Sequence, residues 1–351
     1  MTRAKPGTLR PETSKKPGLA YAFTNEGVEL PVIDVTHPAF EVLLTEEQIA
    51  SGNAAFLTQE RRRAKTPMFI RRFLFRRYAR RSVILQGMMQ ASKSFLSGMN
   101  TYILKLGAAN LGNSYATNVD RFVAASFPAQ IIRLRTQNTA KLLALGIEGP
   151  LRDNPGAPFH LLNIAGGPSA DSLNALILIA KTAPGLLRAR RICIHVLDLE
   201  KDAPDFGKRA LEALQAQGGA LERLDITFTH APYNWSDTTL LRDLLKEIGS
   251  GPCVAAVSTE GGLFEYGNDR DITANLELLM ELAPAGTFVV GSVTRDDESN
   301  RMLLGPSHIP VVRRGLPVFR ALAKGAGWEV ETAIETPFSD VVRLARIRSS
   351  H

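Results

Sequence analysis

The chain has 351 residues, 44% of them hydrophobic, and a net charge of +7 that comes from residues 1–150, because the later residues hold more acids than bases. This composition predicts a full buried core and two domains, and the only cysteines, Cys193 and Cys253, lie in apolar runs that support neither disulfides nor a cysteine metal site. No apolar run approaches the ~20 residues that a membrane-spanning helix needs. The basic amino terminus is not followed by the apolar stretch that a secretory signal requires. We therefore expect a cytoplasmic protein without a membrane partner.

An arm and a strap come first along the chain. Residues 1–18 are rich in Lys, Pro, Thr and Ser, which predicts a disordered arm. In the next segment Pro31 and Pro38 oppose a helix, and β-branched residues between them favour an extended chain. We expect this segment to pack as an ordered strap.

A helical pattern follows, beginning at the N-cap residue Thr45 and continuing to Leu145. We expect three or four helices, at about 45–62, 67–97, 98–111 and 117–146. Together with the strap, residues 19–150 would form a helical lid that supplies much of the substrate pocket.

The second of these helices is strongly basic. Its apolar residues Phe69, Ile70, Phe73 and Leu74 recur at helical spacing, so we expect them to be buried and the arginines to form a solvated face. An anionic partner stays open as an alternative, although no nucleic-acid motif accompanies the cluster and we do not expect nucleic acid. The cations of the cluster are Arg61, Arg62, Arg63, Lys65, Arg71, Arg72, Arg76, Arg77, Arg80 and Arg81.

The segment 146–158 is rich in Pro and Gly, which marks the expected domain boundary. Beyond it, apolar strand-like runs alternate with helical stretches, and this predicts an α/β fold with a doubly wound, Rossmann-like, mostly parallel sheet in residues 151–351. An antiparallel hairpin around Pro337 should close one edge. We expect strands at 160–165, 191–197, 225–229, 253–258 and 287–293, and helices at 171–182, 206–217, 240–248, 271–282 and 316–325.

Ligands of such sheets bind beyond the carboxyl ends of the strands. The first such segment turns sharply at two glycines and opens a helix with free N–H groups. It lacks the spaced glycines of the dinucleotide fingerprint, which argues against NAD, and by itself it could be a plain turn. Its candidate binding residues are Asn163, Ala165, Gly166, Gly167, Pro168 and Ser169.

The segments that follow the next two strands contribute further candidate binding residues: a carboxylate after the second strand, and small and planar side chains after the third. Asp198, followed by Leu199, can accept hydrogen bonds from both hydroxyls of a ribose. The third strand ends at His230, and Ala231, Pro232 and Tyr233 follow, where an adenine could lie.

In this order the segments resemble those of the class I S-adenosylmethionine-dependent methyltransferases, over about residues 159–347. Residues 163–169 are similar to the family's first motif, although Asn163 replaces its acid and only Gly167 keeps a family glycine. Asp198 matches the ribose acid, 230–233 the adenine segment and 253–267 the segment that lines the methionine moiety and the substrate. The resemblance implies S-adenosyl-L-methionine as co-substrate.

Methyl transfer needs alignment above all, because the sulfonium is already a good leaving group. An acceptor that carries a proton also needs a base, for which the candidates are His230, Glu260, Glu265 and Tyr266. No metal-ligand spacing is visible, so we expect no metal. In the lid, Tyr115, Asn118 and Phe127 are candidates to face the site, with packing as their more ordinary role.

Three functions remain open at this point. A methyltransferase acting on a small molecule of secondary metabolism is favoured. Alternatively, attack on the aminocarboxypropyl γ-carbon would release methylthioadenosine, as in azetidine-2-carboxylate synthases, and the uncharged Asn163 would suit a donor amine that stays neutral. The third is a domain that binds without catalysis; a homodimer is left open in each case.

Overall fold

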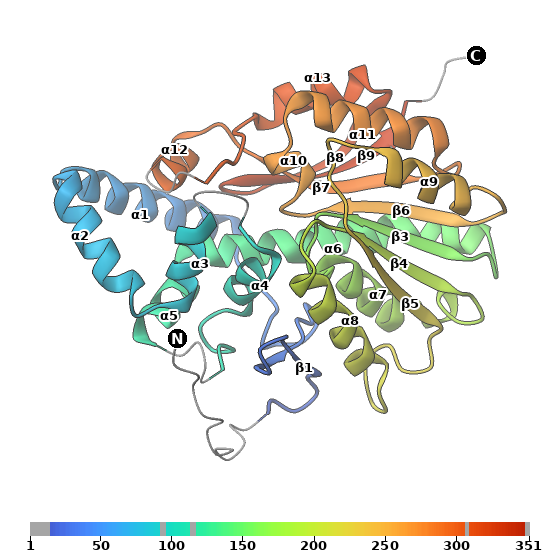
Figure 1. The fold of residues 1–351 in the computed structure, drawn as a ribbon, viewed down its shortest axis with the longest axis horizontal. Coiled ribbons are helices and arrows are strands. Elements are labelled where there is room, and N and C mark those ends of the chain that lie inside the picture. Colours follow the sequence, from blue (N-terminus) through green and yellow to red (C-terminus); the bar gives the residue numbers. More distant parts are fainter. Residues whose placement is uncertain (1–14, 92–95, 113–116, 306–308, 348–351) are drawn as a thin grey trace.

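The computed structural model describes residues 15–91, 96–112, 117–305 and 309–347, and it has an α/β architecture (Figure 1). Its main sheet has seven strands in the order β5-β4-β3-β6-β7-β9-β8. The strands are β3 (Phe159–Ile164), β4 (Ile192–Leu197), β5 (Ile226–Ala231), β6 (Val254–Thr259), β7 (Phe288–Thr294), β8 (Trp328–Glu335) and β9 (Ser339–Arg346). The first five are parallel, and β9 lies antiparallel between β7 and β8, which confirms the doubly wound fold and its closing hairpin.

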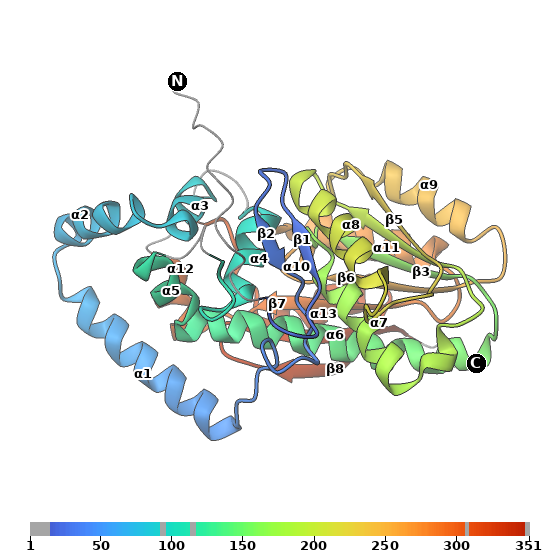
Figure 2. The ribbon, with the colours of Figure 1, turned by 90° about the horizontal axis from the view of Figure 1, so that it is seen from below.

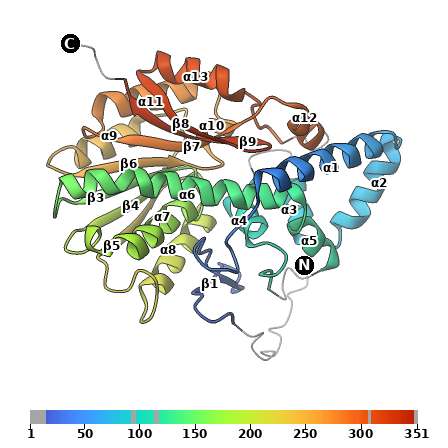
Figure 3. The same cartoon turned by 180° about the vertical axis from the view of Figure 1, so that it is seen from behind.

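Helices cover both faces of this sheet (Figures 1 and 3). On one face lie α6 (Phe127–Asp153), α7 (Ala170–Thr182) and α8 (Asp202–Gln215); on the other lie α9 (Thr239–Ile248), α11 (Asp269–Leu282) and α13 (Gly315–Gly325). Side chains of a strand alternate between these faces, so Ile194 and Val196 enter one core and Leu197 the other. Burial on both sides explains why the parallel strands are continuous apolar runs.

The helices before the sheet are α1 (Glu46–Ala64), α2 (Met68–Ala79), α3 (Val83–Ala91), α4 (Gly98–Leu106) and α5 (Asn118–Ala124). Thr45 caps α1 through a capping box with Gln48, as its position in the sequence predicts. The single helix expected at 67–97 is instead divided into α2 and α3, because the Ser82 hydroxyl caps the start of α3 by accepting from Leu85 N at 3.0 Å.

The helix expected at 117–146 is likewise two helices, α5 and α6. Its carboxyl end is also further along the chain, since α6 continues through the glycines and Pro150 to Asp153. Gly146 lies directly against β7, where a Cβ atom would meet the Phe288 ring at 2.5 Å. This glycine therefore serves close packing of helix on sheet rather than the end of a helix.

Helix α2 departs most from expectation. Phe69 is 73% exposed and Phe73 66% exposed, and Ile70 and Leu74 are exposed as well, so the prediction that these residues are buried is wrong. Figures 1 and 2 show the reason: α2 lies at the outer end of the molecule, remote from the sheet. Across the described ranges, no helix is both long enough and apolar enough to cross a bilayer.

The strap forms a short hairpin of β1 (Tyr21–Phe23) and β2 (Glu29–Pro31), and the residues after it cross to α7. There the Asn174 side chain accepts from Val35 N at 2.7 Å and donates to Ile33 O at 2.9 Å. The strap is thus ordered, as predicted. Residues 1–14 of the expected arm lie outside the described residues, whereas residues 15–18 contact the strap through bonds such as Lys16 N to the Tyr21 hydroxyl at 2.9 Å.

Candidate functional site

A pocket lies at the carboxyl ends of β3 to β6, beside the switch point of the sheet between β3 and β6, where open α/β sheets bind ligands. One wall comes from the strand-end loops and the other from α4 and Leu96, which lies two residues before it. The lining residues are Leu96, Gly98, Thr101, Tyr102, Lys105, Ala165, Gly166, Gly167, Pro168, Ala170, Asp198, Leu199, Glu200, Tyr233, Trp235, Glu260, Gly261, Gly262 and Tyr266.

The loop after β3 admits only small residues. A Cβ atom on Gly166 would meet Asn163 Oδ1 at 1.9 Å. Gly167 has φ of +56° and a Cβ there would meet the Gly98 backbone of α4 at 2.9 Å. The glycines therefore let α4 approach the loop and leave main-chain groups at the pocket wall.

Asp198 joins this loop to the end of β4. Its Oδ2 accepts from Gly167 N at 3.0 Å and its Oδ1 from Glu200 N at 2.9 Å. Burial raises the pKa of the Asp198 carboxyl, and the two backbone donors oppose that rise. Each carboxylate oxygen retains acceptor capacity, so the group can still receive hydroxyl donors from the pocket.

The structure brings together most of the residues chosen from the sequence, but not all of them. Among the expected binding residues, Ala165, Gly166, Gly167, Pro168, Asp198, Leu199 and Tyr233 line the pocket. Asn163 and Ser169 are fully buried beneath the loop, and Pro232 is exposed. Ala231 lines a different cavity, between β4, β5 and α9.

The base candidates divide in the same way. Glu260 and Tyr266 line the pocket, whereas Glu265 and His230 are not among its lining residues. The His230 Nε2 atom lies 2.9 Å from the Asp198 carbonyl oxygen, so this ring contacts the backbone just after β4.

An acid that the sequence did not single out as a site residue lies next to Asn163. The amide of Asn163 donates to Asp171 Oδ1 at 2.7 Å and to the Ser258 hydroxyl at 2.9 Å. Asp171, in the first turn of α7, is only 2% exposed. Burial, and after it the charge of Glu260, raises the pKa of Asp171 to about 6. A carboxyl group is therefore present beneath the loop, on the helix that follows it.

Four buried charges connect the lid to the strand ends. Glu260 pairs with Lys105 of α4 and, through Oε1, with Arg135 Nε of α6 at 2.6 Å. Arg135 Nη1 also binds Glu265 at 2.8 Å, on the short helix α10 (Leu263–Tyr266). Burial raises the pKa of Glu260, but Arg135 and Lys105 outweigh it and lower the value to about 2. Glu260 is thus a poor proton acceptor; sequence reasoning missed Lys105 and Arg135 because nothing in their local pattern marks them.

Aromatic groups line the pocket around Tyr233. Its hydroxyl donates to Asn275 Oδ1 at 2.6 Å, and burial raises the pKa of Tyr233. Trp235, which the sequence did not single out, lines the same wall and is 9% exposed. Burial also raises the pKa of Tyr266 on the opposite side. At neutral pH both phenols are therefore hydrogen-bond donors rather than bases.

Of the three candidates expected to face the site, the two that the structure describes, Asn118 and Phe127, do not line this pocket. Phe127 packs on Phe338, with ring centroids 6.0 Å apart, and has the packing role. Asn118 is exposed at the start of α5. Tyr115 lies outside the described residues.

No protein-family model and no curated protein matches this sequence. Among solved structures, a protein of Bordetella parapertussis described as a possible exported protein is similar, with a TM-score of 0.54, 14% identity, and 86% of this chain and 99% of that chain covered. This likeness shows a shared fold.

Two methyltransferases are also among the similar structures. One is the mitomycin 7-O-methyltransferase, with a TM-score of 0.39 and 14% identity over 65% of this chain and 58% of that chain. The other is an O-methyltransferase of neocarzinostatin biosynthesis in complex with S-adenosyl-L-homocysteine and 1,4-dihydroxy-2-naphthoic acid, with a TM-score of 0.36 and 14% identity over 67% and 63%. The chain spans less than two thirds of the length of either enzyme.

Proposed function

We propose that this chain is an S-adenosylmethionine-dependent methyltransferase of class I that acts on a small molecule. Residues 151–351 would bind the methyl donor, and residues 19–150 would close over the acceptor. The observation that carries the proposal is the meeting of three strand-end segments in one pocket, with Gly167 N bonded to the Asp198 carboxylate at 3.0 Å. This pocket lies where a doubly wound sheet binds nucleotides.

The lining residues fit an adenosyl group. Asp198 would accept the ribose hydroxyls, and the aromatic faces of Tyr233 and Trp235 would flank the adenine. Gly166 and Gly167 in the loop after β3 would let the ligand approach the main chain. When bound, S-adenosylmethionine supplies an activated methyl group on its sulfonium.

The other residues would orient the acceptor and exclude water. Gly98 and Lys105 place α4 across the pocket, which narrows access for solvent. Glu260, held as a paired anion, would position its neighbours rather than remove a proton, and Tyr266 would donate a hydrogen bond. Catalysis would then rest chiefly on alignment.

The product formed from S-adenosylmethionine tests the proposal. The protein is incubated with the donor, first alone and then with a panel of phenols, carboxylic acids and amines, and the nucleosides are separated and identified by mass spectrometry. We expect S-adenosylhomocysteine only when an acceptor is present. Methylthioadenosine formed without an acceptor, in excess of the amount that the donor releases in buffer without the protein, would instead establish attack on the aminocarboxypropyl carbon. Binding without turnover would favour a non-catalytic domain.

Asp198→Ala tests the placement of the donor. Loss of a charged partner for ribose hydroxyls should cost roughly 1.5–3 kcal/mol, or about ten- to a hundredfold in affinity for S-adenosylhomocysteine by calorimetry. Asp205→Ala is the matched control, since Asp205 lies in the first turn of α8 and does not line the pocket. Equal affinities of the two variants would place the donor elsewhere.

A further inference from the structure

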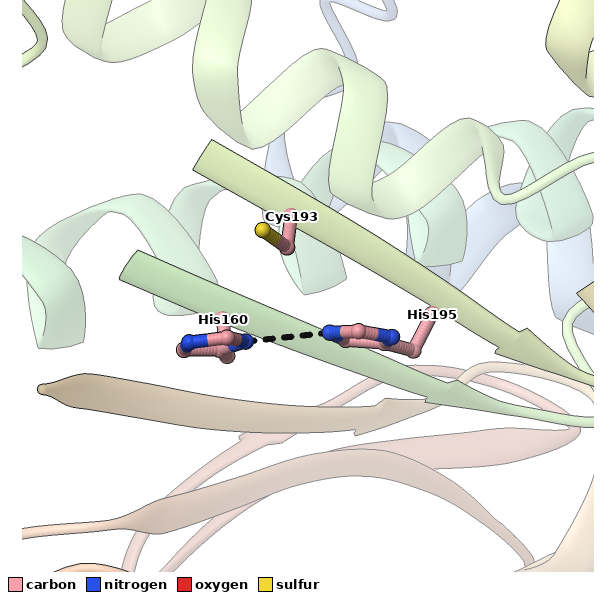
Figure 4. Close-up of side chains that lie close together, drawn as sticks. All are labelled: His160, Cys193 and His195. Atoms are coloured by element: carbon pink, nitrogen blue, oxygen red, sulfur yellow. Dashed lines mark hydrogen bonds between the residues drawn. The ribbon is translucent and has the colours of Figure 1, made fainter. Parts of the chain in front are cut away.

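A second cluster of reactive side chains lies toward the other end of the strands, away from the pocket. His160 on β3 is the register partner of Cys193 on β4, and His195 follows two residues later on the same face. Their ligand-type atoms all lie within 4.8 Å of one another. Figure 4 shows the two imidazoles joined by a hydrogen bond, with Cys193 beside them on the same strand as His195.

The hydrogen bonds define which ring nitrogen is free. The Thr229 hydroxyl lies 3.3 Å from the Ile194 carbonyl, which can only accept, so its single proton is directed there. It must then accept from His195 Nδ1–H, 3.2 Å away. This assignment leaves the lone pair of His195 Nε2 directed at His160 Nδ1, at 3.0 Å.

Both rings are neutral at physiological pH. Burial, followed by the nearby His160, lowers the pKa of His195 to about 4. Burial also lowers the pKa of His160, with Arg191 acting in the same direction and Glu247 against it. Neutral imidazole is the form that binds metals.

A cavity of about 270 Å³ opens beside His195, between β4, β5 and α9. Two carboxylates one helical turn apart on α9, Asp243 and Glu247, line it together with Leu240 and Leu244. The cavity gives an ion a route from solvent, and Glu247 is the carboxylate close enough to affect the pKa of His160.

We propose that His160, Cys193 and His195 bind one divalent transition-metal ion of the zinc class, with Glu247 as the fourth ligand. Nitrogen and thiolate ligands select zinc-like ions over magnesium or calcium. Tetrahedral bonds of about 2.0–2.1 Å to two imidazoles separate the nitrogens by about 3.3 Å. The present 3.0 Å has to widen by only a few tenths of an ångström.

Binding requires a definite movement of protons. The Cys193 thiol loses one proton to solvent as its sulfur becomes a ligand, and the Nδ1 proton of His160 moves to Nε2. Thr229 holds the Nδ1 proton of His195 and so orients the ring toward the ion. The ion would fasten α9 to two strands of the sheet, far from the proposed methyl transfer. The ligands come from adjacent strands, so no local spacing in the sequence reveals them.

Cobalt(II) is the probe for this site. After chelator treatment and dialysis, the full chain is titrated with cobalt(II) at neutral pH. We expect tetrahedral visible bands and a near-ultraviolet thiolate-to-cobalt charge-transfer band that saturate at one ion per chain and disappear on addition of zinc. Cobalt binding without the charge-transfer band, or none at a stoichiometric concentration, would overturn the proposal.

Two pairs of variants locate the ligands. Cys193→Ser should abolish the charge-transfer band, whereas Cys253→Ser should leave it intact, because the Cys253 thiol is outside the cluster and donates to Ile248 O at 3.3 Å. Should Cys193→Ser not fold, Thr229→Val leaves every ligand in place and should weaken cobalt binding by about ten- to a hundredfold. Glu247→Gln should weaken it at least about tenfold, and Arg242→Gln on the same helix should not. A band lost in Cys253→Ser but kept in Cys193→Ser would refute the assignment.

Discussion

At the scale of single residues, Glu260 is the carboxylate at which two buried cations meet. Glu260 is 5% exposed, and its carboxylate forms ion pairs with both Lys105 and Arg135, which are also buried. A buried ion pair adds little net stability when it forms, but removal of one partner leaves the other charge without compensation.

Glu260→Gln should therefore lower the free energy of unfolding by about 3–5 kcal/mol at neutral pH, as measured by urea denaturation. The pKa of Glu260 is lowered in the folded state, so its stabilisation is complete above about pH 4.5 and is lost as pH falls toward about 2. The difference between wild type and variant should shrink over that range.

The control for this variant is Glu281→Gln. Glu281 pairs with Arg242 at 3.4 Å on the surface, so its loss should cost at most about 1 kcal/mol. Similar losses in the two variants would mean that solvent reaches Glu260 and screens its charges.

Among the elements, α2 shows that a helical periodicity of apolar residues does not by itself predict burial. Its apolar residues recur at the spacing of a buried helical face, yet Phe69 and Phe73 are mostly exposed. Periodicity establishes that a helix can form, whereas burial depends on whether a neighbour covers it. The same limit explains the undivided helices expected around Ser82 and Ser126. A new helix begins after each of these residues, although the pattern remains apolar on both sides.

Substitution on α2 should therefore have little effect on stability. Phe69→Ser with Phe73→Ser should change the free energy of unfolding by no more than about 0.5 kcal/mol. Phe56→Ala in α1 should cost about 3–5 kcal/mol, because Phe56 is buried edge-on against Phe338 with centroids 5.2 Å apart. Urea titrations compare them, and a loss above about 2 kcal/mol in the α2 variant would show that its face is covered in solution.

The sheet was the most predictable element, for a physical reason. Each parallel strand is buried on both faces, so its apolar run is visible in the sequence whatever packs on it. The pocket residues at strand ends followed from the same logic, with Asp198 as the clearest case. Lys105 and Arg135 could not be found that way, because long-range packing alone brings them to the strand ends. Asp171 lies close in the chain, in the first turn of α7, but its position gives no sign that it bonds to Asn163.

At the scale of the whole molecule, the amino-terminal segments and the sheet share one core. Leu30, Val32 and Ile33 of the strap belong to the same cluster of buried residues as Leu161 and Ile194 of the sheet. Asn174 of α7 strengthens this connection, because its side-chain amide forms hydrogen bonds with buried backbone groups of the strap.

Asn174→Ala should destabilise the whole chain by roughly 2–4 kcal/mol, since it leaves buried groups of Val35 and Ile33 without partners. Calorimetry should show one cooperative transition at a lower temperature. Asn154→Ala, which removes an exposed side-chain bond to Pro150 O, is the control and should cost less than about 1 kcal/mol. An early separate transition in the Asn174 variant would mean that the strap unfolds independently.

The contact between the strap and α7 also has a consequence for synthesis on the ribosome. The Val35 amide and the Asn174 side chain that receives it are 139 positions apart in the chain. At about 5–20 residues per second, roughly 7–28 s separate the translation of the two. During that interval Val32, Ile33 and Val35 have left the ribosome without their partner, so they are exposed to chaperones. The strap is thus made well before α7, and it can reach its native contacts only after α7 has been made.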